Sequence, residues 1–327
     1  MAHEIDFSNN QANMAYVGET PWHGLGQRLS QGAPIDQWRV EAGLNWDAKR
    51  AQILFTEDNI EEVANPILMQ GESTILYRSD TKAQLGIVSP SYKIVQPGEV
   101  LEFFRDVVAR GDMAIETAGS LDGGKKVWAL AKTNQDFRIM GQDKVEGYLL
   151  LATSFDGTLS TRAQFTSVRV VCNNTLQMSL KSAGGSGISI PHSSEFKADG
   201  VKIDLGILDG GFKLFEEQAN VLAGRRLTSK ESMNYIMQVL TGEVDPEKLS
   251  TRAANTVRGV HALYMGKGMG ASLRSAENTA WGALNAITEY VDHEAGRNVN
   301  NRFRSAQFGK GAETKAKALD QALKLVA

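Results

Sequence analysis

The sequence has very little cysteine and no long apolar run, and both absences narrow its class. Cys172 is the only cysteine among 327 residues, so no intrachain disulfide can form and a reducing compartment is expected. No stretch reaches the roughly 18 apolar residues of a membrane span. The opening ten residues are polar and acidic, so we expect no signal peptide and no membrane partner.

The signatures of common enzyme classes are also missing. The five histidines are scattered, and neither a His-Glu-x-x-His nor a Cys-x-x-Cys motif occurs. The glycine-rich segment 184–187 lacks the Lys-Ser/Thr pair that ends a phosphate-binding P-loop. No Gly-x-Ser-x-Gly motif supplies a nucleophilic serine. We therefore expect no metal, no cofactor and a non-enzymatic function.

Charge is unevenly distributed along a chain of ordinary globular composition. With 42% hydrophobic and 22% charged residues, the length predicts a globular protein of about two domains. The net charge is −3, but residues 250–327 carry 11 Lys+Arg against 6 Asp+Glu, which leaves 24 against 32 for the rest. A local basic surface is therefore expected in the C-terminal part, although the whole chain is slightly acidic.

The segment from 148 to 181 predicts a long β-hairpin. An apolar, β-favouring run covers 148–153, turn residues follow at 155–158, and residues 159–171 alternate. The alternation changes phase near Thr166, which predicts a β-bulge there. With this bulge, Arg162 and Arg169 fall on the same polar face of the strand.

This hairpin is the first candidate for phosphate binding. No Asp or Glu occurs from 157 to 194. Asn174 and Gln177 resemble a helix-capping pair, so a helix is expected to start there, with Asn173 and Asn174 at its N-terminus. An acid-free face with two arginines and a helix start is suited to phosphate groups. The alternative is an ordinary solvated sheet face.

The chain divides by composition into three expected domains. Residues 1–48 form an aromatic-rich N-terminal arm, whose tryptophans dock it on the core or on a neighbouring subunit. Residues 49–200 form an α+β core with the central hairpin, and residues 201–327 a helical C-terminal region. The fold class is α+β: an antiparallel β-sheet of hairpins with helices packed on one face, followed by a mainly helical C-terminal region.

Further basic candidates lie at two turns. In the core, a helix is expected to begin at Pro97. A second hairpin is expected to place Lys125 and Lys126 just after its turn. These two lysines could contact a phosphate, and the alternative is that they are simply solvated. In the C-terminal region, Thr228 and Glu231 predict a capping box at a helix start. A basic connector between the last helices could bind phosphate or simply aid solubility. Its candidates are Arg302, Arg304 and Lys310.

Three segments resemble one known family. They are the opening MAHEIDFSNNQANMAYVGETPWHGLGQ, the hairpin FDGTLSTRAQFTSVRVVCNNTL and the closing WGALNAITEYVDHEAGRNVNNRFRSAQFGKGAETKAKALDQAL. In this order they resemble the phage/plasmid-like proteins grouped as domain of unknown function 932. Phe155 stands where relatives tend to carry His, so no catalytic histidine is expected at that turn. The resemblance implies a protein of phages, prophages and plasmids that acts in the bacterial cytoplasm.

Two functions of different classes follow. The first is a DNA-binding protein that anneals single-stranded DNA in recombination and self-associates, because its hairpin and helix order is similar to that of phage annealing proteins. The second is a host-takeover or anti-defence factor that binds a host protein through its tryptophan-rich arm and helical region. Loss of oligonucleotide binding with rising salt separates the first from the second.

Overall fold

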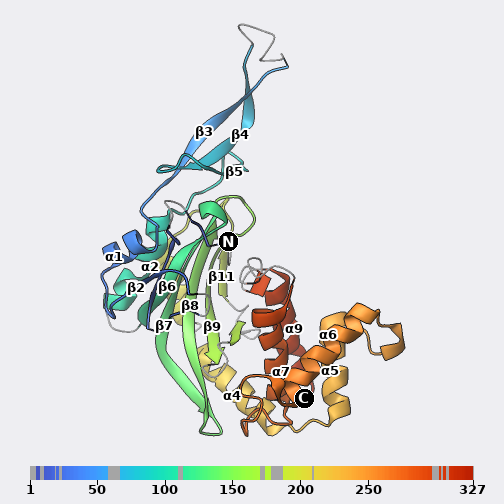
Figure 1. Ribbon diagram of the computed structural model, residues 1–327. Helices are drawn as coiled ribbons and strands as arrows, with labels where there is room; N and C mark the ends of the chain where they lie inside the picture. Colours follow the sequence, from blue (N-terminus) through green and yellow to red (C-terminus); the bar gives the residue numbers. More distant parts are fainter. Residues whose placement is uncertain are drawn as a thin grey trace. The chain divides into compact units, whose positions relative to one another are not determined.

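The computed structural model describes most of the chain as a mixed α+β protein, which confirms the predicted fold class (Figure 1). The described residues are 5–7, 11–18, 20–21, 24–57, 67–109, 113–169, 174–177, 187–207, 210–296, 302, 305–306 and 309–326. They fall into two compact units. The first comprises Met1–Ala131, Leu150–Ala163 and Ile188–Lys202, and the second Lys132–Leu149, Gln164–Gly187 and Ile203–Ala327.

The larger β-sheet has eight strands in the order β10-β9-β8-β7-β6-β1-β2, with β11 also paired to β9. Its members are β1 (Met14–Val17), β2 (Gln27–Leu29), β6 (Met113–Leu121), β7 (Lys126–Ile139), β8 (Asp143–Ser154), β9 (Thr161–Arg169), β10 (Asn174–Gln177) and β11 (Gly187–Ile190). β1 pairs antiparallel with β6 and parallel with β2. Strands β7, β8 and β9 are each divided between the two units.

A second, three-stranded antiparallel sheet lies within the first unit. Its order is β3-β4-β5, built from β3 (Ala48–Phe55), β4 (Met69–Arg78) and β5 (Gln84–Val88). Figure 1 shows β3 and β4 as a long two-stranded ribbon that continues beyond β5. A long ribbon of this kind has few neighbours to cover its sides, and most residues of β3 are exposed.

Helices α1 (Ile35–Glu41) and α2 (Pro97–Ala109) complete the core of the first unit. A third helix, α3 (Ala198–Ile207), begins in the first unit and continues into the second after Lys202. Pro97 occupies the first turn of α2, as predicted. The buried side chains include Trp38 of α1 and Phe103 and Phe104 of α2. Trp46 is buried too, so two tryptophans of the N-terminal segment serve the core of this unit, while Trp22 lies outside the described residues.

The second unit is mainly helical, and it also contains parts of β7, β8 and β9 and the whole of β10. Its helices are α4 (Gly210–Gly224), α5 (Ser229–Thr241), α6 (Thr251–Ala262), α7 (Ala280–Glu289) and α9 (Lys310–Lys324), with the short helical turns η4 (Pro246–Lys248), η5 (Leu263–Lys267) and η6 (Tyr290–Glu294). The short helix η2 (Asp122–Gly124) belongs to the first unit. Rings of Phe137, Phe212, Phe215 and Trp281 pack in succession at centroid distances of 5.3–6.3 Å.

One local prediction around the central hairpin is wrong. The segment from Asn174 to Gln177 is strand β10, not a helix, because it pairs antiparallel with β9. The register between β9 and β10 runs from Thr166 to Arg169 without a shift, but the predicted bulge concerns the pairing of β9 with β8 and stays a prediction. No helix of the described residues is long and apolar enough to span a membrane.

Candidate nucleic-acid interface

Helix α6 begins at a residue suited to start a helix and presents a basic surface. The Ser250 side chain accepts a hydrogen bond from the Ala253 backbone N–H at 3.3 Å, which satisfies one free donor of the first turn. Val257 and Val260 are buried against the rest of the second unit. Arg252 and Arg258 lie on the exposed side of this helix.

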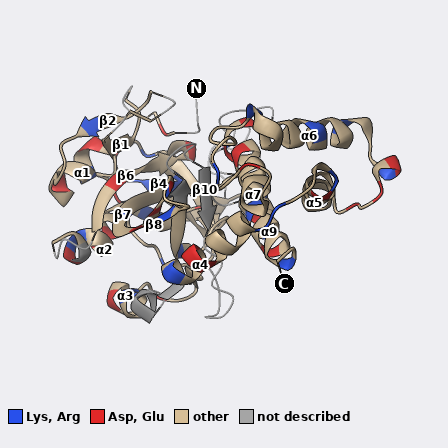
Figure 2. Ribbon diagram, turned by 90° about the horizontal axis from the view of Figure 1, so that it is seen from below, with Lys and Arg blue, Asp and Glu red and all other residues tan. Residues whose placement is uncertain are grey.

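The basic surface continues into the segment after α6. From 251 to 276 the sequence contains no Asp or Glu, but it carries Arg252, Arg258, Lys267 and Arg274. All four side chains are exposed, and none forms an ion pair with another described residue. Figure 2 shows Lys and Arg, and no Asp or Glu, along α6. We call these four residues the α6 cation group.

The loop that carries Lys267 is fixed in place by a carboxylate. The Met269 backbone N–H donates to both oxygens of Glu289, at 3.0 and 3.1 Å. A β-carbon on Gly268 would lie 2.8 Å from the same carboxylate, so glycine permits this close approach. Glu289 is buried on α7 and is used by the loop backbone. Both carboxylate oxygens of Glu289 thus hold the backbone of the loop that carries Lys267.

A serine and a histidine meet behind this surface but do not form a nucleophilic site. Ser232 Oγ lies 3.2 Å from His261 Nε2 and also donates to the Ser229 carbonyl at 3.0 Å. Burial lowers the pKa of His261, which favours the neutral ring. Ser232 is fully buried, so a substrate could not reach its hydroxyl group. The pair instead joins α5 to α6.

The two sheet lysines predicted to bind phosphate have different environments. Lys125 is exposed just before β7. Lys126 is buried, with its Nζ 3.3 Å from Asp122 and 3.2 Å from Asp156. Burial raises the pKa of Asp156, but hydrogen bonds from Thr158 and the charge of Lys126 outweigh it, so the pKa is below its usual value. Lys126 is thus a counter-ion for two carboxylates of the same unit, and its contact with phosphate stays a prediction.

The remaining predicted residues are not brought together. Arg162 is half-buried on β9, where its Nε donates to Ser160 Oγ at 3.4 Å, and it has no ion pair within the described part of the chain. Arg302 donates to the carbonyls of Ala295 at 3.0 Å and Glu294 at 3.4 Å. Lys310 is exposed at the start of α9. Four predicted sites are not described in their side chains, namely Arg169, Asn173, Asn174 and Arg304.

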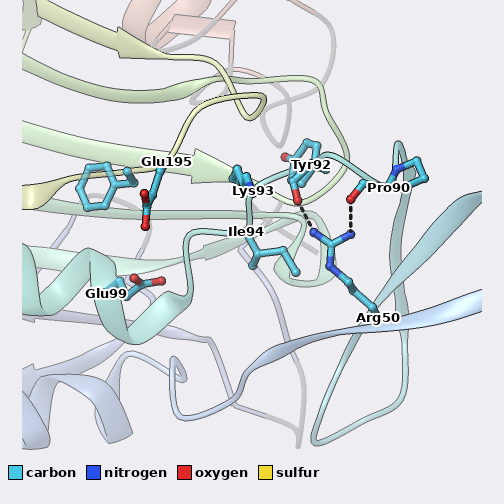
Figure 3. Close-up of a pocket in the computed structure, with 8 residues that line it drawn as sticks. Arg50, Pro90, Tyr92, Lys93, Ile94, Glu99 and Glu195 are labelled. Atoms are coloured by element: carbon cyan, nitrogen blue, oxygen red, sulfur yellow. Dashed lines mark hydrogen bonds between the residues drawn. The ribbon is translucent and has the colours of Figure 1, made fainter.

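The first unit also has a pocket of about 330 Å³ beside α2 (Figure 3). Its lining combines Arg50 and Lys93 with the carboxylates Glu99 and Glu195. Arg50 already donates to two backbone carbonyls, of Pro90 at 3.4 Å and of Tyr92. Glu99 accepts from the Gln96 backbone N–H at 2.6 Å, at the start of α2. With charges of both signs partly used by the backbone, the pocket does not favour a polyanion.

One wall of this pocket is held by a histidine. The ring of His192 stacks on Tyr92 at 4.2 Å, and its nitrogens lie 2.9 Å from the Lys93 carbonyl and 3.0 Å from the Leu159 carbonyl. These contacts tie the segment after β11 to the rest of the first unit.

Within the described residues, no three His, Cys, Asp or Glu side chains converge as a metal site would require.

The α6 cation group was only partly visible in the sequence. A local basic surface was predicted for the C-terminal part, but none of these four residues was named as a candidate site. The signal that would have found them is the lack of acidic residues from 251 to 276, which is as clear as the one used for the central hairpin.

Comparisons with known proteins give one result. A family model described as "Domain of unknown function (DUF932)" matches residues 84–322, which is more than half of the chain. No curated protein and no solved structure matches.

Proposed function

Because the chain belongs to the DUF932 family, whose description names no activity, we propose from the arrangement of charge that the protein binds nucleic acid through its phosphate backbone. The finer form of the proposal is a single-stranded DNA-binding protein of phages or plasmids that acts in annealing or recombination in the bacterial cytoplasm. The α6 cation group is the observation that supports it.

Four exposed cations without counter-ions suit phosphates for an electrostatic reason. Each Lys or Arg that meets a phosphate releases condensed counter-ions, and this release favours binding at low salt. A cation already paired with a carboxylate gains little from a phosphate, because it must first give up its partner. All four side chains are exposed and form no ion pair within the described part of the chain, which supports their availability to phosphates.

The same surface favours backbone contact over base reading. The α6 cation group includes no aromatic side chain for base stacking, and the nearby Tyr264 is buried. Its other exposed large side chains are Met265 and Met269, which can contact bases without distinguishing them. Binding should therefore depend weakly on sequence and strongly on salt.

The decisive experiment measures oligonucleotide affinity against salt concentration. We expect the logarithm of the affinity for single-stranded DNA to fall linearly with the logarithm of salt concentration. In R252A/R258A, the slope should decrease by about 1.4, or about 0.7 for each lost phosphate contact. A matched control is R28A/K197A. Arg28 and Lys197 are exposed residues of the first unit that form no ion pair with another described residue, and the control has the same net charge as R252A/R258A.

A second pair of variants tests the sheet candidates that remain. R162A/K125A should lower the slope of log affinity against log salt concentration only if these two side chains also contact phosphates of the bound oligonucleotide. If neither pair changes binding more than R28A/K197A does, or if the wild-type protein retains no labelled oligonucleotide at low salt, the proposal fails. A complex with a host protein that survives nuclease treatment would then favour the alternative, a protein-interaction factor.

A further inference from the structure

Strand β3 is an open edge of the three-stranded sheet. It pairs with β4 on one side, and the order β3-β4-β5 leaves its other side at the margin. Six of its eight residues are exposed. At its base, the backbone N–H and carbonyl of Ala48 are bonded to the Gln96 side chain, at 2.8 and 3.1 Å. Beyond Ala48, no strand of the described residues pairs with this margin.

The margin of β3 is regular, although the ribbon itself is not. Gln52 is opposite Thr74 and Leu54 is opposite Gln70, so residues 71–73 of β4 stand opposite the single Ile53. The extra residues belong to β4 and leave β3 continuous. A bulge on the edge strand itself would protect that edge from pairing, and β3 has no such protection.

Four exposed side chains near the last described residues of the two ribbon arms are apolar. Leu54 and Phe55 are 54% and 50% exposed, and Ile67 and Leu68 on the opposite arm are 76% and 54% exposed. Apolar side chains gathered beside an open strand edge usually mark an interaction surface. The strand edge and these four side chains lie on the same ribbon.

We propose that β3 pairs antiparallel with β3 of a second copy of this chain, about a two-fold axis at Ile53, to form a homodimer. This register places Lys49 opposite Glu57 of the second copy, twice by symmetry. Both side chains are exposed, and neither has a partner among the described residues. Lys49 of each copy thus lies opposite a residue of opposite charge, Glu57 of the other copy.

The backbone supports the same register. Because the N–H and carbonyl of Ala48 point to Gln96 and not to β4, the even-numbered residues of β3 direct their backbone groups outward. Antiparallel pairing must then join even residues to even residues, such as Gln52 to Leu54 of the second copy. A shift by one residue, which would bring Arg50 opposite Glu57, breaks this rule.

The register also forms a continuous apolar face. Side chains of Ala51, Ile53 and Phe55 lie on one face of β3, because alternate residues share a face. Around the two-fold axis, Ala51 meets Phe55 of the second copy and the two Ile53 side chains meet each other. Six apolar side chains would therefore share one surface across the joined sheets.

The first test exchanges the charges. In K49E and in E57K, like charges face each other at both ends of the strand pair, so the dimer dissociation constant should rise by about tenfold. The double variant K49E/E57K restores opposite charges and should restore the dimer. The measurement is mass by light scattering over a range of protein concentrations. A double variant no better than either single variant contradicts the register.

The second test targets the axis. I53K places two lysines against each other and should give a monomer whose melting temperature equals that of the wild-type chain at concentrations where the wild type is itself monomeric. Its matched control is I87K, because Ile87 is an exposed isoleucine at the other margin of the same sheet. I87K should remain dimeric. A wild-type chain that is monomeric at every concentration, or a dimer that survives I53K, overturns the proposal.

Discussion

Arg78 carries a positive charge into the core of the first unit. Its side chain is 2% exposed and is paired with Asp6 and with Asp80, the latter at 2.7 Å. Its guanidinium group lies 4.5 Å from the ring centre of Trp46. Burial lowers the pKa of Arg78, but the two carboxylates outweigh it and the pKa is raised.

We predict that R78M destabilises the protein by about 3–5 kcal/mol, because Asp6 would remain buried without its cationic partner. The free energy of unfolding from urea titration measures this loss. R105A is the control: Arg105 also pairs with a carboxylate, Glu102, but both are exposed. Its midpoint should stay close to that of the wild type, and an equal loss in both variants would contradict the assignment.

At this scale, the sequence identifies charges but not their partners. Lys126 looks like a surface lysine at a turn, yet Asp156, which neutralises it, follows 30 residues later. Arg78 likewise meets Asp6, 72 residues earlier. A local sequence pattern covers only a few residues, so it does not predict pairs that are 30 or 72 residues apart in the sequence. The α6 cation group differs from these two residues, because it lies in a stretch without Asp or Glu from 251 to 276.

Among the helices, α5 shows how far local sequence can determine an element. Thr228 accepts from the Glu231 backbone N–H at 3.2 Å, and the Glu231 carboxylate accepts from the Thr228 backbone N–H at 2.7 Å. This is the capping box that the spacing of the two residues predicts. Hydrogen bonds from Thr228 and from Arg225 lower the pKa of Glu231 to about 2.

We predict that T228A destabilises the protein by about 1 kcal/mol near neutral pH and raises the pKa of Glu231 toward its usual value of 4.5. Because the folded-state pKa is lowered, the stabilisation by Glu231 is present above pH 4.5 and is lost as the pH falls toward 2. T228A should therefore show a weaker loss of stability across this window. Carboxyl NMR titration and unfolding at each pH measure both effects, and an unchanged Glu231 titration would contradict them.

Strand β10 shows where the same local reasoning fails. Asn174 and Gln177 have the spacing of a capping pair, but they are the first and last residues of a four-residue strand. Their pairing with Arg169 and Thr166 of β9 supplies backbone hydrogen bonds that a helix would otherwise provide. Pairing between segments overrides a weak local preference, and only the fold reveals which segments meet.

For the whole molecule, the two units are interleaved along the chain. The predicted boundary at residue 200 lies close to the last point where the chain passes from one unit to the other, between Lys202 and Ile203, but the chain passes between the units four times before it. A change in sequence composition near residue 200 indicates where the chain changes from mainly strands to mainly helices. They do not reveal that β7, β8 and β9 each contribute residues to both units.

The second unit depends on residues that precede its helices. Asp143 of β8 is fully buried and accepts hydrogen bonds from Ser275 Oγ at 2.8 Å and from Trp281 Nε1 at 3.0 Å. Phe137 of β7 packs on Phe215 of α4 at 5.9 Å. A chain that starts at residue 201 lacks both Asp143 and Phe137.

We therefore predict that a fragment of residues 201–327 does not fold cooperatively, although it contains the helices α4 to α9. Trp281 would lose its buried hydrogen-bond acceptor, and the aromatic cluster would be open on one side. The expected result is helical far-UV circular dichroism with a broad thermal transition and little near-UV signal from Trp281. A fragment of residues 132–327, which restores both residues, is the matched comparison and should recover part of the near-UV signal. A sharp transition in the shorter fragment would show that the helices form an independent domain and that the boundary at residue 200 is the structural one.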